Sequence, residues 1–139
     1  MEKKNGGCLC GETRYQLEGA AVAEIICHCA DCKKQTGSSY SVIAGFTQDQ
    51  FKWIADKQIK HFETGGDSGG SVKRFFCGEC GSPLLSDASA TPGLYWIKTG
   101  SLDDSSWVKP SMEIYAKDKI QSGNTTLELQ SYQNGPPRN

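Results

Sequence analysis

The sequence predicts a mainly β fold made of small antiparallel sheets with short strands. Segments with partial apolar alternation recur along the chain, and many are rich in β-branched and aromatic residues. Turn-forming residues separate these segments, and the 139 residues include 16 glycines. No window of useful length carries the apolar stripe of an amphipathic helix.

The expected strands follow one another with little but turns between them. "ETRYQLEG" and "AVAEIICH" come first, separated by Gly19, and "GLYWIKTG" and "SMEIYAK" come last. Three segments of similar composition lie between these pairs, at residues 38–46, 58–64 and 71–77. The order predicts a chain of strands joined by short connections.

Turn chemistry predicts three loops, at residues 65–70, 86–93 and 101–106. The first, "GGDSGG", is too polar and flexible to pack and indicates an exposed hairpin loop. A single helical turn is expected after Cys32, around "KKQTG", because Asp31 can cap it and Gly37 can end it.

Length and composition predict a single domain over residues 1–139, with a core at about 6–132 and a disordered tail at 133–139. The apolar fraction of 37% is low, so metal cross-links would add needed stability. A formal net charge of -1 argues against nucleic-acid binding through bulk electrostatics. No apolar run of about 18 residues predicts a membrane span. The N-terminal stretch lacks the apolar run of a secretory signal, so we expect a cytoplasmic protein.

The cysteines are the most informative residues. In the reducing cytosol they are more often metal ligands or reactive thiols than disulfides. Seven are present, as a C-x-C, a C-x-C-x-x-C and a C-x-x-C: Cys8 and Cys10, then Cys27, Cys29 and Cys32, then Cys77 and Cys80. The last pair, flanked by glycines after an apolar strand, predicts a zinc knuckle. A redox dithiol is disfavoured because the βαβ context is missing.

The number of cysteines suggests how they divide. A knuckle supplies two ligands, whereas structural zinc takes four, so Cys8 and Cys10 can complete the site of Cys77 and Cys80. The remaining three would then hold a second zinc with an open position, which is typical of catalytic zinc. His28 or His61 could instead close that position and make both sites structural. We expect His28 to point away from the metal, because both of its neighbours would face it.

Four ordered motifs resemble those of the glutathione-dependent formaldehyde-activating enzyme family, which also includes the domain of centromere protein V. These motifs are "GGCLCGETRY", "CHCADCKKQTGSSYSVIAGF", "FFCGECGSPL" and "IKTGSLDD". The resemblance extends from Gly6 to about Tyr115. It implies a β-tent fold around two zinc ions per chain, one structural and one catalytic. It also implies the partition reached by counting, with the catalytic zinc on Cys27, Cys29 and Cys32.

The activity that this resemblance implies is addition of glutathione to formaldehyde, which makes the protein a zinc-dependent carbon–sulfur lyase. The open position could activate the substrate thiol or polarise a carbonyl. Thiol activation is favoured by analogy with the family, and because three thiolates leave the zinc site at a net charge of about -1.

The polar residues after the three cysteines are candidates for substrate contact: Lys33, Lys34, Gln35, Thr36 and Ser38. The two lysines could attract an anionic thiol, although ordinary surface lysines are favoured at these positions. Trp53, Trp96 and Trp107 are expected in the core. Two other functions stay open: a zinc-binding scaffold or interaction module with two structural zincs, and a thiol-based metal or redox sensor.

Overall fold

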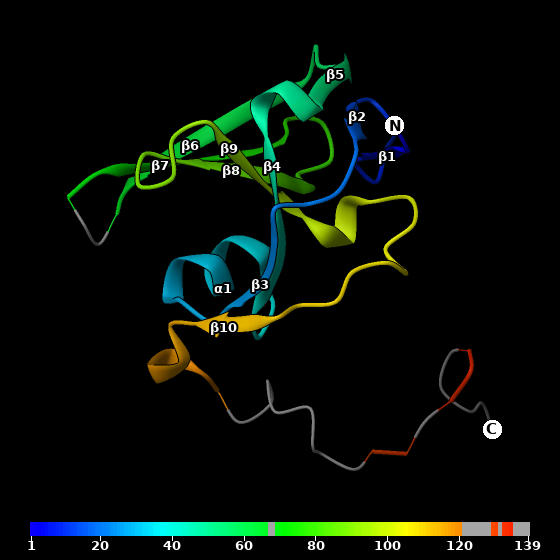
Figure 1. The fold of residues 1–139 in the computed structure, drawn as a ribbon. Helices are drawn as coiled ribbons and strands as arrows, with labels where there is room; N and C mark the ends of the chain where they lie inside the picture. Colours follow the sequence, from blue (N-terminus) through cyan, green and yellow to red (C-terminus); the bar gives the residue numbers. More distant parts are fainter. Residues whose placement is uncertain (67–68, 121–128, 131, 135–139) are drawn as a thin grey trace.

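The computed structural model describes residues 1–66, 69–120, 129–130 and 132–134 (Figure 1). The prediction of a mainly β protein is confirmed, because this part of the chain forms two sheets, one α-helix and three short 3-10 helices. No helix among the described residues is long and apolar enough to cross a membrane. Most of the predicted disordered tail, residues 135–139, lies outside the described residues.

A three-stranded antiparallel sheet has the order β1-β2-β5. Its strands are β1 (Lys3–Gly7), β2 (Arg14–Glu18) and β5 (Phe51–Ala55). Strands β1 and β5 were not predicted. The sequence of β1, "KKNGG", has little strand propensity, and the strand forms because it pairs with β2. Gly6 is required there, because a Cβ would lie 2.4 Å from the hydroxyl oxygen of Tyr15.

The larger sheet has the order β10-β3-β4-β9-β8-β7-β6 in the described part of the chain. Its strands are β3 (Ala23–Cys27), β4 (Ser41–Thr47), β6 (Ile59–Gly65), β7 (Ser71–Cys77), β8 (Pro83–Ala88), β9 (Leu94–Lys98) and β10 (Met112–Ile114). One pair differs from the antiparallel expectation, because β10 lies parallel to β3. Strand β8 was also not predicted, and it extends into the loop expected at 86–93, so the turn begins after Ala88.

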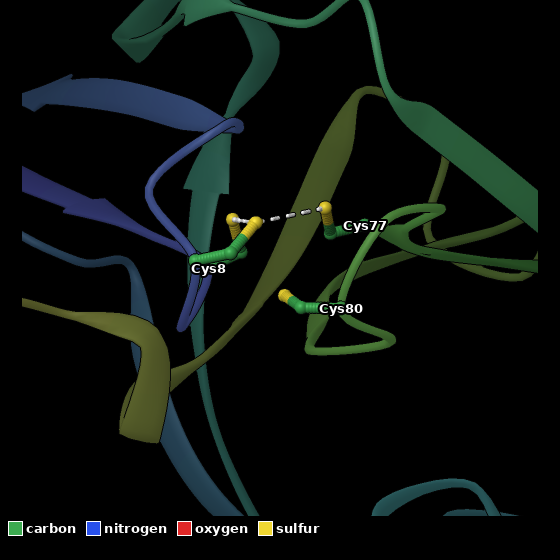
Figure 2. Close-up of side chains that lie close together, drawn as sticks. Cys8, Cys77 and Cys80 are labelled. Atoms are coloured by element: carbon green, nitrogen blue, oxygen red, sulfur yellow. Dashed lines mark hydrogen bonds between the residues drawn. The ribbon is translucent and has the colours of Figure 1, made fainter.

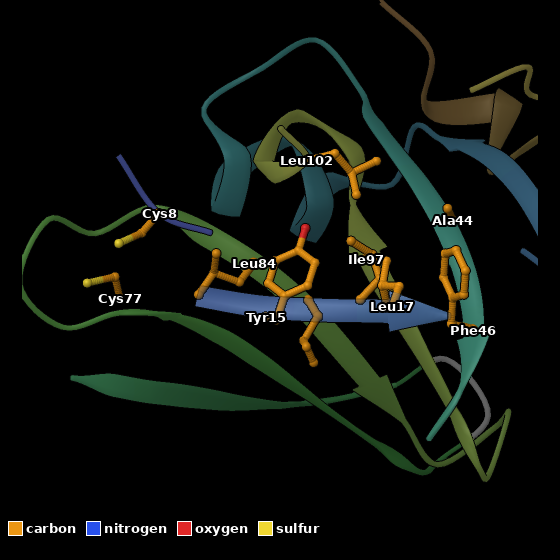
Figure 3. Packing of buried hydrophobic residues seen from close by; sticks show 10 residues of the cluster. Cys8, Tyr15, Leu17, Ala44, Phe46, Cys77, Leu84, Ile97 and Leu102 are labelled. Carbon is orange, nitrogen blue, oxygen red and sulfur yellow. The ribbon is translucent and has the colours of Figure 1, made fainter. Parts of the chain in front are cut away.

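The two faces of the larger sheet have different roles. Ala44, Phe46 and Ile97 lie on one face and pack against Tyr15 and Leu17 of the small sheet (Figure 3). These five side chains are fully buried and form the main core.

The opposite face carries a second buried cluster. It contains Ile25 and Ile43, which are register partners, together with Cys27 and Cys32. Trp96 is partly buried against this cluster. The larger sheet therefore separates the main core from a smaller, cysteine-containing one.

Helix α1 (Ala30–Thr36) follows β3. It begins before the predicted position, and its N-cap is Cys29 rather than Asp31, because the sulfur of Cys29 accepts a hydrogen bond from the Cys32 amide at 3.3 Å. It ends where predicted, at Gly37, whose φ of 66° is left-handed. The three 3-10 helices are η1 (Gln48–Gln50), η2 (Thr99–Ser101) and η3 (Ala116–Asp118).

The predicted hairpin at 65–70 joins β6 and β7, in which Gly65 faces Ser71 across the antiparallel pair. Residues 67–68 of this loop lie outside the described part of the chain. In the loop predicted at 101–106, the Ser106 amide donates to a carboxylate oxygen of Asp104 at 3.0 Å, a bond typical of an Asx turn.

Candidate metal centres

Two turns meet at a cluster of four sulfurs. The turn between β1 and β2 carries Cys8 and Cys10, and the turn between β7 and β8 carries Cys77 and Cys80. Figure 2 shows the side chains of Cys8, Cys77 and Cys80 directed toward one another. In the second turn, the Gly81 amide donates to the Cys77 carbonyl at 2.8 Å, and the φ of 80° at Gly81 suits glycine. The sequence prediction that these four cysteines gather is therefore matched by the fold.

The spacing of the four sulfurs fits a tetrahedral zinc ion. The sulfur of Cys10 lies 3.6 Å from that of Cys8 and 3.9 Å from that of Cys77. All four sulfurs lie within 4.8 Å of one another. A tetrahedron with Zn–S bonds of about 2.3 Å has sulfur–sulfur edges of about 3.8 Å. Both the donor set and the distances therefore suit structural zinc.

Hydrogen bonds reach three of the four sulfurs. The Thr13 amide donates to the sulfur of Cys8 at 3.2 Å, and the Glu79 amide donates to that of Cys77 at 3.4 Å. The hydroxyl of Ser82 lies 3.3 Å from the sulfur of Cys80, and this hydrogen bond is the main cause that lowers the pKa of Cys80 to about 5.

The second cluster contains three sulfurs at the junction of β3 and α1. Cys27 is the last residue of β3, Cys29 caps α1, and Cys32 lies in the first turn of the helix. Their sulfurs lie within 4.8 Å of one another, and Cys27 and Cys32 are buried. Hydrogen bonds from the thiols of Cys27 and Cys29 lower the pKa of Cys32 far below its ordinary value, and Lys98 and Arg74 act in the same direction.

Neither histidine supplies a fourth ligand to this cluster in the described part of the chain. His28 is 1% exposed, and its Nε2 lies 2.9 Å from a carboxylate oxygen of Glu113 on β10. His61 is exposed, and its ring packs on Phe75. Among the described residues, no carboxylate joins the three sulfurs either. The three-sulfur cluster thus offers three protein ligands, which fits zinc with one open position.

A cavity of about 560 Å³ adjoins the three sulfurs, a volume within the usual range for small-molecule sites. Its walls include apolar side chains and two buried cations, namely Ile25, Ile43, Val72, Trp96, Arg74 and Lys98. Trp96, which was expected in the core, packs against the smaller cysteine-containing cluster and also lines this cavity.

Trp96 lies over Gly45 of the neighbouring strand β4. A Cβ at Gly45 would come 2.8 Å from the Trp96 ring, so only glycine leaves room for it. The indole nitrogen donates to the Thr91 hydroxyl at 2.9 Å, which fixes the ring on the cavity wall. Trp53 and Trp107 pack against the main core, as expected.

The five predicted substrate-contact residues are not among those that line this cavity. The ammonium of Lys33 donates to the Asp118 carbonyl at 2.6 Å, and Lys34 is exposed. The side-chain oxygen of Gln35 is buried without a hydrogen-bond partner. The hydroxyl of Thr36 donates to the Cys32 carbonyl at 2.7 Å, and Ser38 is exposed.

Thr36 and Ser38 line a second cavity of about 840 Å³. Arg14 and Asp103 close part of its wall through paired hydrogen bonds, one of them 2.9 Å long. Contact of the five residues with a substrate stays a prediction.

Sequence reasoning missed Arg74 and Lys98 as residues of the three-sulfur cavity. Arg74 follows Lys73 in the sequence, and the strand pattern does not show which of the two faces inward. Lys98 ends an apolar strand, where a lysine ordinarily reaches solvent. Only the register, which pairs Lys98 with Ile43 and Arg74 with Ser86, places both on the inner face.

Comparison with known proteins agrees with these features. A family model described as glutathione-dependent formaldehyde-activating enzyme matches residues 3–118, so the chain belongs to this family. A crystal structure of a Rhodobacter sphaeroides protein is similar in fold, with a TM-score of 0.59 and 19% sequence identity. The similarity covers 71% of this chain and 87% of that one.

Proposed function

We propose that this member of the glutathione-dependent formaldehyde-activating enzyme family is a zinc-dependent carbon–sulfur lyase. Its substrates would be a thiol such as glutathione and a small aldehyde such as formaldehyde. Family membership supports this reaction class. The observation that carries the proposal is the three-sulfur cluster, which faces a cavity and has no fourth protein ligand among the described residues.

The reaction forms one carbon–sulfur bond. The sulfur of the thiol attacks the aldehyde carbon, the carbonyl π bond breaks, and the new alkoxide takes up the proton that the thiol has lost. The product from glutathione and formaldehyde is S-hydroxymethylglutathione, and the reverse direction cleaves the same bond. Zinc, when bound, would lower the pKa of the substrate thiol.

The residues of the chain have separate roles in this scheme. Cys27, Cys29 and Cys32 would hold the catalytic zinc, and the Cys32 amide donates a hydrogen bond to the Cys29 sulfur. Ile25, Ile43 and Trp96 would limit the access of water to the reacting sulfur. The second zinc would be structural and held by Cys8, Cys10, Cys77 and Cys80. The polar residues Lys33, Lys34, Gln35, Thr36 and Ser38 stay proposed substrate contacts, and a cytoplasmic location stays a prediction.

A Cys29→Ser variant tests the proposal. Cys29 is only half-buried, so we expect a folded protein with one zinc per chain. Glutathione and formaldehyde also combine without an enzyme, so this variant should leave the rate of S-hydroxymethyl adduct formation from ¹³C-labelled formaldehyde, followed by NMR, at its uncatalysed value. Acceleration of adduct formation by this variant equal to that by the wild-type protein would contradict the catalytic role. Two equally inert zincs in the wild-type protein, with no binding of thiol, would support the scaffold alternative instead.

A further inference from the structure

Two buried cations lie on the wall of the three-sulfur cavity. Arg74 on β7 is 6% exposed, and Lys98 on β9 is 5% exposed. The ammonium of Lys98 donates to the hydroxyl of Ser41 at 3.0 Å, and Ser41 is the register partner of Cys27. Both cations therefore reach the sheet face that carries the cysteines.

The hydrogen bonds of these cations are incomplete. The guanidinium of Arg74 donates through Nη1 to the hydroxyl of Thr64, but its Nε is buried without a partner. Neither Arg74 nor Lys98 forms an ion pair with a carboxylate of the described residues. Burying a cation without a counter-charge is costly, so such groups normally face an anion.

The cysteines do not account for both positive charges. Three thiolates and one zinc ion carry a net charge of about -1, whereas the two side chains carry two positive charges when both are protonated. Asp31, Lys117 and Asp118 also line the cavity, where Lys117 pairs with Asp118 and no carboxylate of the described residues pairs with Arg74 or Lys98. The two buried cations therefore remain available to an anionic ligand. A carboxylate matches such donors, because a guanidinium and an ammonium both bind its oxygens through charge-assisted hydrogen bonds.

We propose that Arg74 and Lys98 form a carboxylate-binding subsite that selects anionic thiols for the three-cysteine zinc. This inference rests on the proposed function, because it assumes that a thiol occupies the open zinc position. The thiol sulfur would bind at the cysteines while its carboxylate binds at the two cations. Neutral thiols would reach the zinc but would lack the second contact.

Two thiols that differ by one charge test this subsite, namely 3-mercaptopropionate and its methyl ester. Binding to the zinc-loaded protein is measured by isothermal titration calorimetry. A charge-assisted hydrogen bond predicts about 10- to 100-fold tighter binding of the carboxylate form by the wild-type protein. Arg74→Met and Lys98→Met should each remove most of this preference, and Arg74→Lys should retain part of it because the charge remains.

Lys73→Met is the matched control, because Lys73 is the exposed neighbour of Arg74 on the same strand. It should leave the preference unchanged. Equal binding of the two thiols by the wild-type protein, or a preference that survives both Met variants, would overturn the subsite and leave the proposed function intact. If neither thiol binds the wild-type protein, the proposed function itself fails. If Arg74→Met does not fold, the ratio of the affinities of the wild-type protein for the two thiols and the same ratio for Lys98→Met still test the subsite.

Discussion

Replacing Cys10 by serine tests the structural role of the four-sulfur site without disturbing the core, because Cys10 is exposed. The site joins two turns that are 67 positions apart in the chain, counted from Cys10 to Cys77. The loop-closure relation for a cross-link gives about 4 kcal/mol of stability for a loop of this length. The same relation gives only about 2 kcal/mol for the short loop from Cys27 to Cys32.

These values predict a difference in thermal unfolding. For a chain of this size, 1 kcal/mol shifts the midpoint by about 4 °C, so Cys10→Ser should melt about 15 °C below the wild-type protein. Cys29→Ser is the matched comparison. After dialysis of all three proteins against a chelator that strips three-ligand zinc, its midpoint should lie within a few degrees of wild type. Midpoints that fall equally in the two variants, measured by circular dichroism with zinc content determined in parallel, would refute a division into structural and catalytic sites.

Three further variants probe the surroundings of the sites. Gly45→Ala should lower the free energy of unfolding, measured by urea denaturation, by about 1–3 kcal/mol, because the new Cβ would lie 2.8 Å from the Trp96 ring. An unchanged denaturation midpoint would show that the ring is free to move. Tyr15 is fully buried, and burial raises its pKa to about 12. In an ultraviolet titration of the wild-type protein Tyr15 should therefore be the last tyrosine to ionise, and the Tyr15→Phe variant should lack this last step. Ionisation of Tyr15 near pH 10 would contradict this prediction. Asp103→Asn should cost no more than about 1 kcal/mol at pH 7, because the pair with Arg14 is largely exposed. The hydrogen bond from Arg14 lowers the pKa of Asp103 below 3.8. The stability that the pair contributes is therefore complete above that pH and is lost as the pH falls through the lowered pKa. NMR titration of the Asp103 carboxyl measures this pKa, and a raised value would contradict the prediction.

The sequence predicted the grouping of the cysteines because metal coordination restricts the possibilities strongly. The short spacings Cys8–Cys10 and Cys77–Cys80 each deliver two sulfurs from a single turn, and four sulfurs complete one tetrahedron. Few other divisions of the seven cysteines give four ligands to one zinc while keeping each closely spaced group of cysteines together. The start of α1 was less predictable, because Cys29 is an unusual cap and Asp31 is a common one.

The walls of the cavity depend on contacts that are distant in the sequence. Trp96 was expected in the core because large aromatic residues are usually buried there, and its place became clear only from its position over Gly45. Arg74 and Lys98 are charged residues in strands, and their inward direction depends on the register of β7, β8 and β9. A shift of one residue would reverse it, and sequence alone does not fix that register.

The open position at Cys27, Cys29 and Cys32 is tested most directly by zinc K-edge X-ray absorption before and after addition of a thiol. Four sulfurs at one zinc and three at the other predict an average sulfur coordination of about 3.5, with the remainder from lighter atoms. Glutathione should raise this average to about 4, because its sulfur fills the open position. An average of 4 without any thiol, or one that stays at 3.5 when glutathione is saturating, would contradict the account.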